Sequence, residues 1–221
     1  MTELQAVDLR HSVRNYIDKE IELDTANILK EFIGEVSKQS GLNIQLILNE
    51  PKAFDCQMAK YGRFKGVKNY IAFVGTRCKE VDEKIGYFGE KIVLKAQTLG
   101  LNTCWVALTY KKIKSAIKLE KGEKIIIVIS LGYGVDNGKN RKSKNIKQVS
   151  NANSSSPKWF IDGVNSALKA PTALNQQQFY FELKDGVVYA KKGLGFYAQM
   201  DLGIAKYHFE IGANKDNFRW G

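Results

Sequence analysis

The chain has 221 residues, of which 44% are hydrophobic and 26% are charged, so it has the composition of a globular protein with room for one sizeable domain or two small ones. Its longest apolar run, near residues 125–131, is far shorter than the roughly 20 residues of a membrane span, and residues 1–9 are too polar for a secretory signal. We therefore expect a cytoplasmic protein without a membrane partner. The formal charge of +11 favours polyanions or phosphorylated small molecules, without choosing between them.

The cysteines and histidines give no metal-binding pattern. Cys56, Cys78 and Cys104 are widely spaced and form no C-x-x-C pair, and the chain has only two histidines. This usage does not fit a zinc site, and it is typical of reduced thiols that fill the core. We expect no metal.

The first 134 residues alternate between helical and strand periodicity. The expected helices cover residues 25–38, 86–99 and about 111–118, and the expected strands cover residues 42–48, 69–75 and 124–134, with a short buried segment at 104–108. Asp24 or Thr25 is the expected N-cap of the first helix, and Gly41 its stop.

The second part of the chain begins with a change of composition. Residues 135–158 are polar and lack apolar periodicity, which predicts a long surface connection. A helix follows from Trp159, then a hairpin around Asp185-Gly186, and then a helix over about residues 196–211. His208 lies on the apolar face of that last helix and is interpreted as a packing residue.

A faint internal repeat relates the two parts. Residues 42–45 read Leu-Asn-Ile-Gln and residues 174–177 read Leu-Asn-Gln-Gln, each after a predicted helix. A glycine followed by two aromatic residues then occurs at 86–88 and again at 195–197. These matches indicate a degenerate duplication of one ancestral half.

Four segments carry the residue types of a binding site. Residues 10–14 (Arg-His-Ser-Val-Arg) form either a solvated turn or an anion site, and the basic residues after Gly138 form either a solvated loop or a phosphate clamp. Residues 169–179 are rich in amides, which suits either a planar hydrogen-bonding ring or a plain helix-to-hairpin connection. Residues 100–109 would place buried backbone beside whatever the basic residues hold.

Together these segments resemble the nitroreductase family of flavin enzymes. Residues 10–16 match the family's R-[RH]-S-x-[RK]-x-[FY] start, and residues 94–108 match its helix, leucine-glycine turn and Trp-Val strand. Residues 131–133 and 139–141 match the Leu-Gly-Tyr strand end and the basic K-x-R loop that follow in the family. The resemblance implies an α+β fold with a central, mainly antiparallel sheet flanked by helices.

One departure from the family pattern concerns the Pro-Ser-x-x-Asn-x-Gln segment. The family places it after the first helix, whereas here the matching segment is residues 171–177. The chain therefore resembles members in which two half-domains are fused into an intramolecular pseudo-dimer. We expect an N-terminal half over residues 1–134, a basic connection over 135–158 and a partner-like half over 159–221. A monomer with an internal pseudo-two-fold axis is expected, and further dimerisation stays possible.

The resemblance also implies the cofactor and the residues that bind it. Arg10 and Ser12, with Lys139 and Arg141, would hold the phosphate of FMN, and His11 would contact the ribityl or phosphate region. Arg14 would lie near the N1/C2-carbonyl edge of the ring and tune its potential. The remaining predicted flavin contacts are Leu108, Thr109, Pro171, Thr172, Asn175 and Gln177.

The implied chemistry belongs to the flavin, so no catalytic side chain is assigned. NADH or NADPH would donate a hydride to flavin N5, and a small electron-poor acceptor such as a nitroaromatic compound or a quinone would then be reduced. Two alternatives remain open at this point: a flavin-binding or storage protein without turnover, and, argued from the charge of +11, a basic nucleic-acid-binding protein. We expect no nucleic-acid partner.

Overall fold

The computed structural model describes residues 1–76 and 78–221. The chain forms two compact units, each assembled from segments that are distant in sequence. One contains strands β1 to β4 and comprises Leu9–Cys78 and Ile92–Asn140; we call it the β1–β4 unit. The other comprises Met1–Asp8, Lys79–Lys91 and Arg141–Gly221, and we call it the β5–β7 unit.

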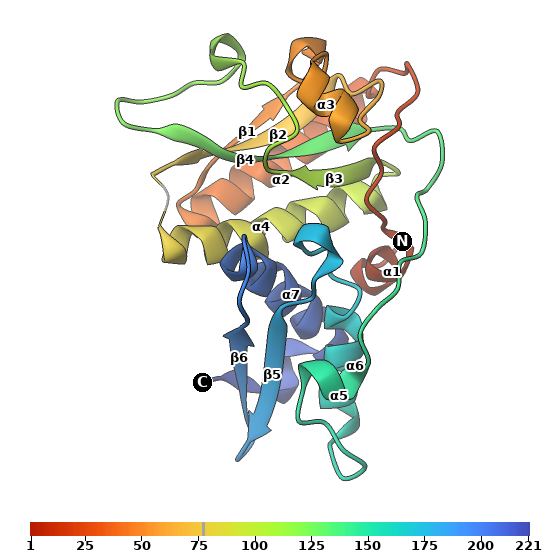
Figure 1. The fold of residues 1–221 in the computed structure, drawn as a ribbon, viewed down its shortest axis with the longest axis vertical. Coiled ribbons are helices and arrows are strands. Elements are labelled where there is room, and N and C mark those ends of the chain that lie inside the picture. The colour runs from red at the N-terminus through yellow and green to blue at the C-terminus, as the bar shows by residue number, and fades with distance from the viewer. Residues whose placement is uncertain (77) are drawn as a thin grey trace. The chain divides into compact units, whose positions relative to one another are not determined.

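An antiparallel sheet forms the centre of the β1–β4 unit (Figure 1). Its strand order is β1 (Asn43–Ile47), β2 (Asn69–Gly75), β4 (Lys124–Gly132) and β3 (Asn102–Val106). The two inner strands, β2 and β4, are almost wholly buried, as expected for strands that are covered on both faces, and β4 is rich in β-branched residues. Because β3 ends the order, one of its edges is available to another segment.

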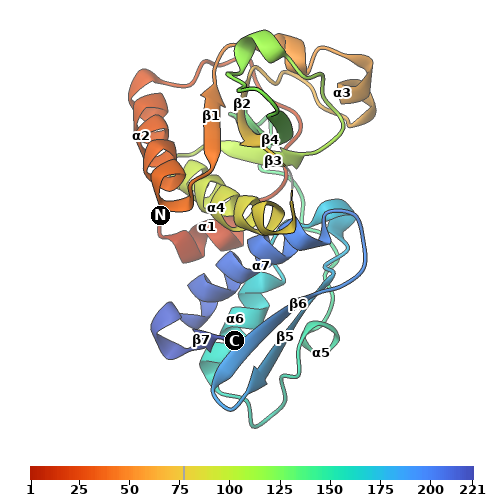
Figure 2. The same cartoon turned by 90° about the vertical axis from the view of Figure 1, so that its left-hand side faces the viewer.

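Helices and an aromatic core cover the two faces of this sheet. Helix α2 (Leu23–Ser40) packs beside β1 and buries Leu29, Ile33 and Val36 (Figure 2). It ends at Gly41, whose φ of 71° places it in the left-handed region and whose N–H donates to the Ser37 carbonyl. The smaller elements of the unit are α3 (Gln57–Tyr61), η1 (Pro51–Ala53) and η2 (Lys114–Ala116). The second part of helix α4 (Lys79–Thr98), from Ile92 onward, also belongs to this unit.

The β5–β7 unit is built on two long helices and a small sheet. Helices α6 (Lys158–Ala167) and α7 (Ala198–Ala213) pack along each other, and β5 (Phe179–Lys184) and β6 (Val187–Lys192) form a hairpin that β7 (Arg219–Trp220) joins in parallel (Figure 2). The short elements are α1 (Glu3–Leu9), α5 (Ile146–Val149), η3 (Ala173–Asn175) and η4 (Lys215–Asn217). Phe160, Phe181 and Phe209 form its buried aromatic core.

Two glycines allow the first part of α4 to approach α7 closely inside the β5–β7 unit. A Cβ added to Gly86 would lie 2.0 Å from the Met200 carbonyl oxygen, and one added to Gly203 would lie 2.1 Å from the Glu83 carbonyl oxygen. Both distances are impossible for real atoms. Each helix therefore needs its glycine where the two backbones meet.

Most of the predicted elements are confirmed, with boundaries that shift by a few residues. Strand β2 has the predicted bounds, and the hairpin turns at Asp185-Gly186, where both residues have positive φ. Helix α2 begins at Leu23, so Asp24 and Thr25 lie inside the helix and neither is its N-cap; Glu22 occupies that position without a side-chain cap hydrogen bond. The predicted helix over 86–99 begins seven residues earlier, at Lys79.

Other expectations are wrong. Only the single 3₁₀ turn η2 forms within residues 111–118, and a short helix, α5, interrupts the connection that was expected to be irregular. Leu108 is 70% exposed, so the buried segment ends before it. The cysteines are free thiols, but Cys78 is exposed and only Cys104 is a buried core residue.

None of the helices within the described residues is both long enough and apolar enough to span a bilayer. The compact units do not follow the predicted division at residues 134 and 158, since each unit takes segments from both parts of the chain. The predicted division was into two related halves, and that relationship stays a prediction.

Candidate functional site

Residues 10–16 run as an extended segment along the edge of β3 in the β1–β4 unit. We call them the N-terminal strap. Ser12 pairs with Thr103 in a parallel bridge, and the Val13 N–H donates to the Thr103 carbonyl at 3.0 Å. The strap therefore uses the outer backbone groups of an edge strand. Its arginines and serine are carried on a fixed backbone instead of a flexible turn.

Tyr16 fixes the far end of the strap. Its N–H donates to the Lys65 carbonyl at 2.9 Å, and its buried hydroxyl bonds the Val13 carbonyl at 2.8 Å and the Ser130 hydroxyl at 2.9 Å. Burial raises the pKa of Tyr16 far above its ordinary value. The hydroxyl thus stays neutral, and the strap is held by bonds that do not titrate near neutral pH.

The two arginines of the strap lie in different environments. Arg10 is 5% exposed, whereas Arg14 is exposed and its guanidinium lies 5.8 Å from the centre of the Phe64 ring. Burial raises the pKa of the Cys104 thiol, and Arg14, a hydrogen bond with Ser12, and Arg10 partly oppose that rise. The strap's cations and its hydroxyl therefore gather near the Cys104 sulfur.

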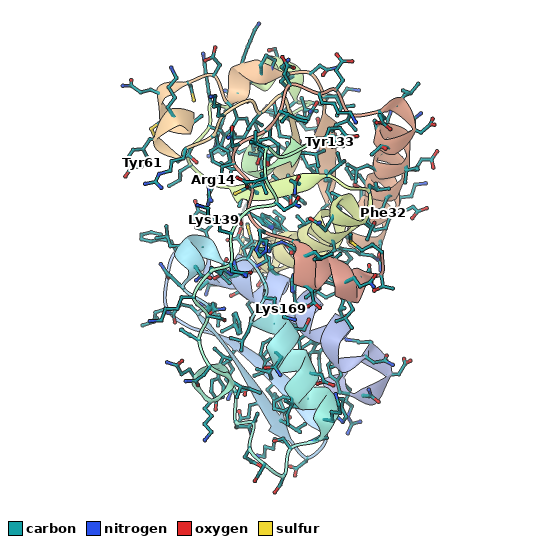
Figure 3. The ribbon with its side chains drawn as sticks, turned by 90° about the vertical axis from the view of Figure 1, so that its right-hand side faces the viewer. Arg14, Phe32, Tyr61, Tyr133, Lys139 and Lys169 are labelled. Carbon is teal, nitrogen blue, oxygen red and sulfur yellow. The ribbon has the colours of Figure 1, made fainter. Side chains whose placement is uncertain are left out.

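The basic loop after β4 lies against the strap at Gly138. Gly138 has φ +81°, and a Cβ there would lie 2.6 Å from the Cβ of His11 and 3.5 Å from the Ser12 carbonyl oxygen. Gly138 is thus the residue that lets this loop lie against the strap. The exposed Lys139 follows directly, and Figure 3 labels it together with Arg14.

Leu108 and Thr109 follow β3 in the same unit. A Cβ on Gly62 would lie 2.6 Å from both the Cβ and the hydroxyl oxygen of Thr109, so this turn packs against Gly62. The Leu108 side chain points into solvent. The backbone contacts predicted for these two residues stay a prediction.

Residues 171–177, which we call the amide segment, belong to the β5–β7 unit and have an unusual backbone. Leu174, Asn175 and Gln177 have φ values of 51°, 55° and 49°. Residues other than glycine rarely adopt this left-handed conformation, and each instance costs on the order of 1 kcal/mol. Pro171 is buried, whereas Leu174 is 90% exposed. The surroundings must hold such a segment in place.

Side chains supply much of that hold. The Gln177 amide accepts from the Lys144 N–H at 2.7 Å and donates to the Leu168 carbonyl and the Ser143 hydroxyl, each at 2.8 Å. The Gln177 N–H in turn donates to the Thr172 hydroxyl at 3.1 Å. The Gln177 side chain, which is 1% exposed, is thereby bonded at both ends of its amide.

Asn175 is bonded at only one end of its amide. Its Nδ2 donates to the Lys142 carbonyl at 2.7 Å, while its buried Oδ1 meets no donor among the residues that the structure describes. A buried carbonyl oxygen without a donor costs free energy, so this atom fits a ligand that brings an N–H or O–H group.

Arg141 secures the chain just before the amide segment. Its Nη2 donates to the Lys169 carbonyl at 2.7 Å and to the Ala170 carbonyl at 2.5 Å, beyond the end of α6. Of the four predicted phosphate ligands, Arg10, Ser12 and Lys139 lie in the β1–β4 unit, whereas Arg141 is the first residue of the last segment of the β5–β7 unit. Its contact with a phosphate stays a prediction.

Asp201, on α7, binds the backbone of the amide segment, a role that was not expected from the sequence. Its Oδ1 and Oδ2 both accept from the Ala173 N–H, at 3.0 and 3.1 Å, and the residue is 4% exposed. Burial raises the pKa of Asp201 from 3.8 to about 7, against a smaller opposing effect of the Ala173 N–H. The available signal was an aspartate inside the otherwise apolar run Met200–Ala205.

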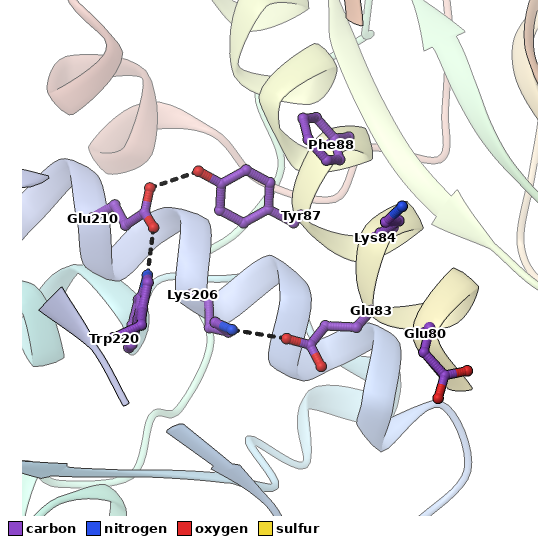
Figure 4. Close-up of a pocket in the computed structure, with 8 residues that line it drawn as sticks. All are labelled: Glu80, Glu83, Lys84, Tyr87, Phe88, Lys206, Glu210 and Trp220. Carbon is purple, nitrogen blue, oxygen red and sulfur yellow. Dashed lines mark hydrogen bonds and ion pairs between the residues drawn. The ribbon is translucent and has the colours of Figure 1, made fainter. Parts of the chain in front are cut away.

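A separate pocket of about 340 Å³ lies on the β5–β7 unit, between α4, α7 and Trp220 (Figure 4). Lys206 pairs with Glu83 at 2.8 Å, and Glu210 accepts from the Tyr87 hydroxyl and from the Trp220 indole N–H, both at 2.6 Å. These five polar groups of the pocket thus satisfy one another. It contains none of the predicted flavin ligands.

His208 is confirmed as a packing residue. It is fully buried, its Nδ1 lies 3.2 Å from the Ser166 carbonyl oxygen, and its Nε2 lies 2.9 Å from Glu90 Oε1. Both ring nitrogens therefore have partners inside the β5–β7 unit.

The fold and these sites match one protein family. A family model described as "Putative TM nitroreductase" matches residues 3–213, which is nearly the whole chain. The protein therefore belongs to this nitroreductase family. No curated protein matches the sequence.

Solved structures show the same fold. A putative nitroreductase from Thermotoga maritima matches with a TM-score of 0.73 and 21% identity, over 98% of this chain and 85% of its own. A putative nitroreductase in complex with FMN from Desulfovibrio desulfuricans matches with a TM-score of 0.51 and 17% identity, over 67% of this chain and 95% of its own. A putative NADH dehydrogenase/NAD(P)H nitroreductase from Bacteroides thetaiotaomicron has a TM-score of 0.51 and 19% identity, over 66% and 95%.

Proposed function

We propose that the protein is an FMN-dependent oxidoreductase that takes a hydride from NADH or NADPH and reduces a small electron-poor acceptor, such as a nitroaromatic compound or a quinone. The observation that carries this proposal is the N-terminal strap: two arginines and a serine on a backbone fixed to β3, with the Lys139 loop against it, in a chain of the nitroreductase family. The FMN named for the Desulfovibrio neighbour and the NAD(P)H named for the Bacteroides neighbour support the same reading.

The residues present fit FMN on two grounds. A phosphate dianion needs several charged or hydroxyl donors, and Arg10, Ser12 and Lys139 supply them from one unit. The polar edge of a flavin ring presents an N–H, and the donorless Oδ1 of Asn175 suits such a group. When bound, FMN supplies a two-electron carrier that accepts and releases hydride.

In this proposal, the side chains bind FMN and adjust its reduction potential. Arg10, Ser12, His11 and Lys139 hold the phosphate end, and Arg14 places a fixed positive charge near the ring edge, where it stabilises the anionic reduced form. Thr172 and Asn175 bond the polar edge of the ring.

The remaining predicted ligands have smaller roles in this proposal. Gln177 maintains the shape of the amide segment, since its amide is already bonded at both ends. Arg141 retains its predicted place at the phosphate, and Leu108, Thr109 and Pro171 line the ring with backbone and apolar groups.

We also propose that the chain is a fused pseudo-dimer, which works as a monomer with one flavin site. The support is the repeated glycine-aromatic-aromatic sequence, which lies within α4 at residues 86–88 and directly before α7 at residues 195–197. Light scattering coupled to size-exclusion chromatography should give one chain with one FMN. Two flavins per chain would contradict the single site.

The decisive experiment is a visible spectrum. The purified protein is mixed with FMN, freed of excess flavin, and recorded before and after anaerobic addition of NADH or NADPH. Retained absorbance that bleaches with either nucleotide supports the oxidoreductase. Retained absorbance that neither nucleotide bleaches would favour a binding or storage protein, and loss of all flavin would refute the proposal.

A further inference from the structure

Asp201 occupies a position that is costly for a carboxylate. It lies in the first turns of α7 with 4% of its surface exposed, and one backbone N–H, that of Ala173, faces both of its oxygens. A buried carboxylate normally gains an arginine, a lysine or several donors. Among the described residues, no cation pairs with Asp201.

The charged groups on the neighbouring elements are engaged elsewhere. Glu83 of α4 bonds Lys206 and Gln199, and Glu90 of α4 bonds His208. The other titratable neighbours with partners of their own are Tyr87 with Glu210, Lys169 with Asp8, and Lys144 with the Gln177 carbonyl. The amide segment itself has no titratable side chain. Asp201 therefore titrates independently of a charged partner.

The single bond of Asp201 ends inside the strained part of the chain. Ala173 precedes Leu174 and Asn175, two of the three residues with positive φ, and Thr172 and Asn175 are the proposed ring ligands. Strain of this kind persists only where the surroundings impose it. Asp201 thus binds the amide segment at Ala173, directly before the residues with positive φ.

The direction of the pH effect follows from linkage. Burial raises the pKa of Asp201 to about 7, so the closed segment binds the proton more tightly than a segment that has moved away and admitted water. The closed form is then favoured below the ordinary pKa near 3.8 and loses that advantage as pH rises to about 7, beyond which the effect is constant. Water stabilises the ionised carboxylate, and water reaches Asp201 when the amide segment opens.

We propose that Asp201 is a positioning residue for the amide segment: it accepts from the Ala173 N–H and so holds Thr172 and Asn175 in their binding conformation. The closed segment is more stable when Asp201 carries a proton, because burying the ionised carboxylate costs more than its stronger bond to Ala173 returns. The claim about the segment depends on Asp201 and Ala173 alone. The claim that flavin affinity follows the segment rests on the proposed function.

The test compares the wild-type chain with Asp201→Asn. Asparagine mimics the protonated acid, because it is neutral and keeps a carbonyl that accepts from Ala173. Asp162→Asn is the matched control, since Asp162 lies on α6 in the same unit and pairs with Lys158 in a more exposed place. Hydrogen exchange of the Ala173 amide, corrected for the intrinsic pH dependence, is measured from pH 5 to 8 without flavin.

In the wild type and in Asp162→Asn, protection of Ala173 should fall by up to about tenfold per pH unit between pH 5 and 7 and then level off. In Asp201→Asn it should stay high and flat. Equal pH profiles for the wild type and Asp201→Asn would overturn the proposal. Should Asp201→Asn fail to fold, the Ala173 amide resonance of the wild type must titrate together with the Asp201 carboxyl carbon, and an Ala173 resonance that does not move would overturn it equally.

The second measurement is FMN affinity over the same pH range. Wild-type affinity should fall by at least about fivefold from pH 5 to 7.5, with no such fall in Asp201→Asn. If FMN binds neither chain while Ala173 protection behaves as expected, the proposed function fails and the positioning role stands. If FMN binds both chains with the same pH dependence, the link between the segment and the flavin fails.

Discussion

The N-terminal strap and the amide segment carry most of the proposed flavin ligands, but they are held in opposite ways. The strap is fixed by backbone pairing to β3 and by the neutral Tyr16 hydroxyl. The amide segment has a strained backbone that is held by side chains, among them a carboxylate that titrates near neutral pH. If both segments bind FMN as proposed, we expect the phosphate to meet a rigid backbone and the ring to meet a segment whose conformation depends on pH.

The largest expected effect comes from breaking the helix crossing inside the β5–β7 unit. Gly86→Ala would place a methyl group 2.0 Å from the Met200 carbonyl oxygen, so α4 and α7 must separate. We expect a loss of about 3 kcal/mol or more in the free energy of unfolding, measured in urea. Gly34→Ala is the control: nothing lies within 4 Å of the added atom, and the helix gains about 0.5–1 kcal/mol. Similar stability of the two variants would contradict the close crossing.

The next effect tests the charge of the strap. Arg10→Met keeps most of the buried volume and removes the guanidinium. A charge-assisted bond is worth about 1.5–3 kcal/mol, so FMN should bind roughly ten- to a hundredfold more weakly, with riboflavin affinity unchanged. Isothermal titration with both flavins measures the difference. An equal loss for both would show that Arg10 does not bind the phosphate.

The hold on the strap can be weakened directly. Tyr16→Phe removes two buried hydrogen bonds and leaves the Ser130 hydroxyl with one partner fewer, which should cost about 1–2 kcal/mol of stability. Because Tyr16 stays neutral, this cost should be the same at pH 5.5 and pH 8, in contrast to the pH dependence expected at Asp201. Tyr61→Phe, at an 83% exposed tyrosine, should have no effect. A pH-dependent cost at Tyr16 would remove the distinction between the two regions.

The sequence predicted the strap better than the amide segment for physical reasons. Residues 10–14 are recognised by their charge, and β2 and β4 by their apolar runs, so local sequence patterns are enough to predict these segments. The three positive φ values of residues 174–177 occur at leucine, asparagine and glutamine, and only asparagine has a local preference for this conformation. Asp201 became visible only when α7 folded against Ala173, and the donorless Asn175 oxygen depends on the whole β5–β7 unit.

The close approach of α4 and α7 was equally hidden. The sequence places Gly86 at the start of the expected helix over residues 86–99 and gives Gly203 no role, since their need for space arises from backbone atoms of another helix. The strap's anchor on β3 was missed for the same reason: pairing to an edge strand is a contact between distant segments. The motifs were readable from the chain and their chemistry stays a prediction, whereas the bonds that position them were not readable.

The smallest expected effect separates the two arginines of the strap. Arg14 is exposed, so water screens its charge, and Arg14→Gln should leave FMN bound while lowering its reduction potential slightly, because a cation near the ring stabilises the anionic reduced form. Equilibration with a reference dye under anaerobic conditions measures the change. Lys121→Gln, which removes a charge from an exposed turn elsewhere in the β1–β4 unit, controls for the overall charge of the chain. An unchanged or raised potential in Arg14→Gln would place Arg14 away from the ring, and the strap would then serve the phosphate alone.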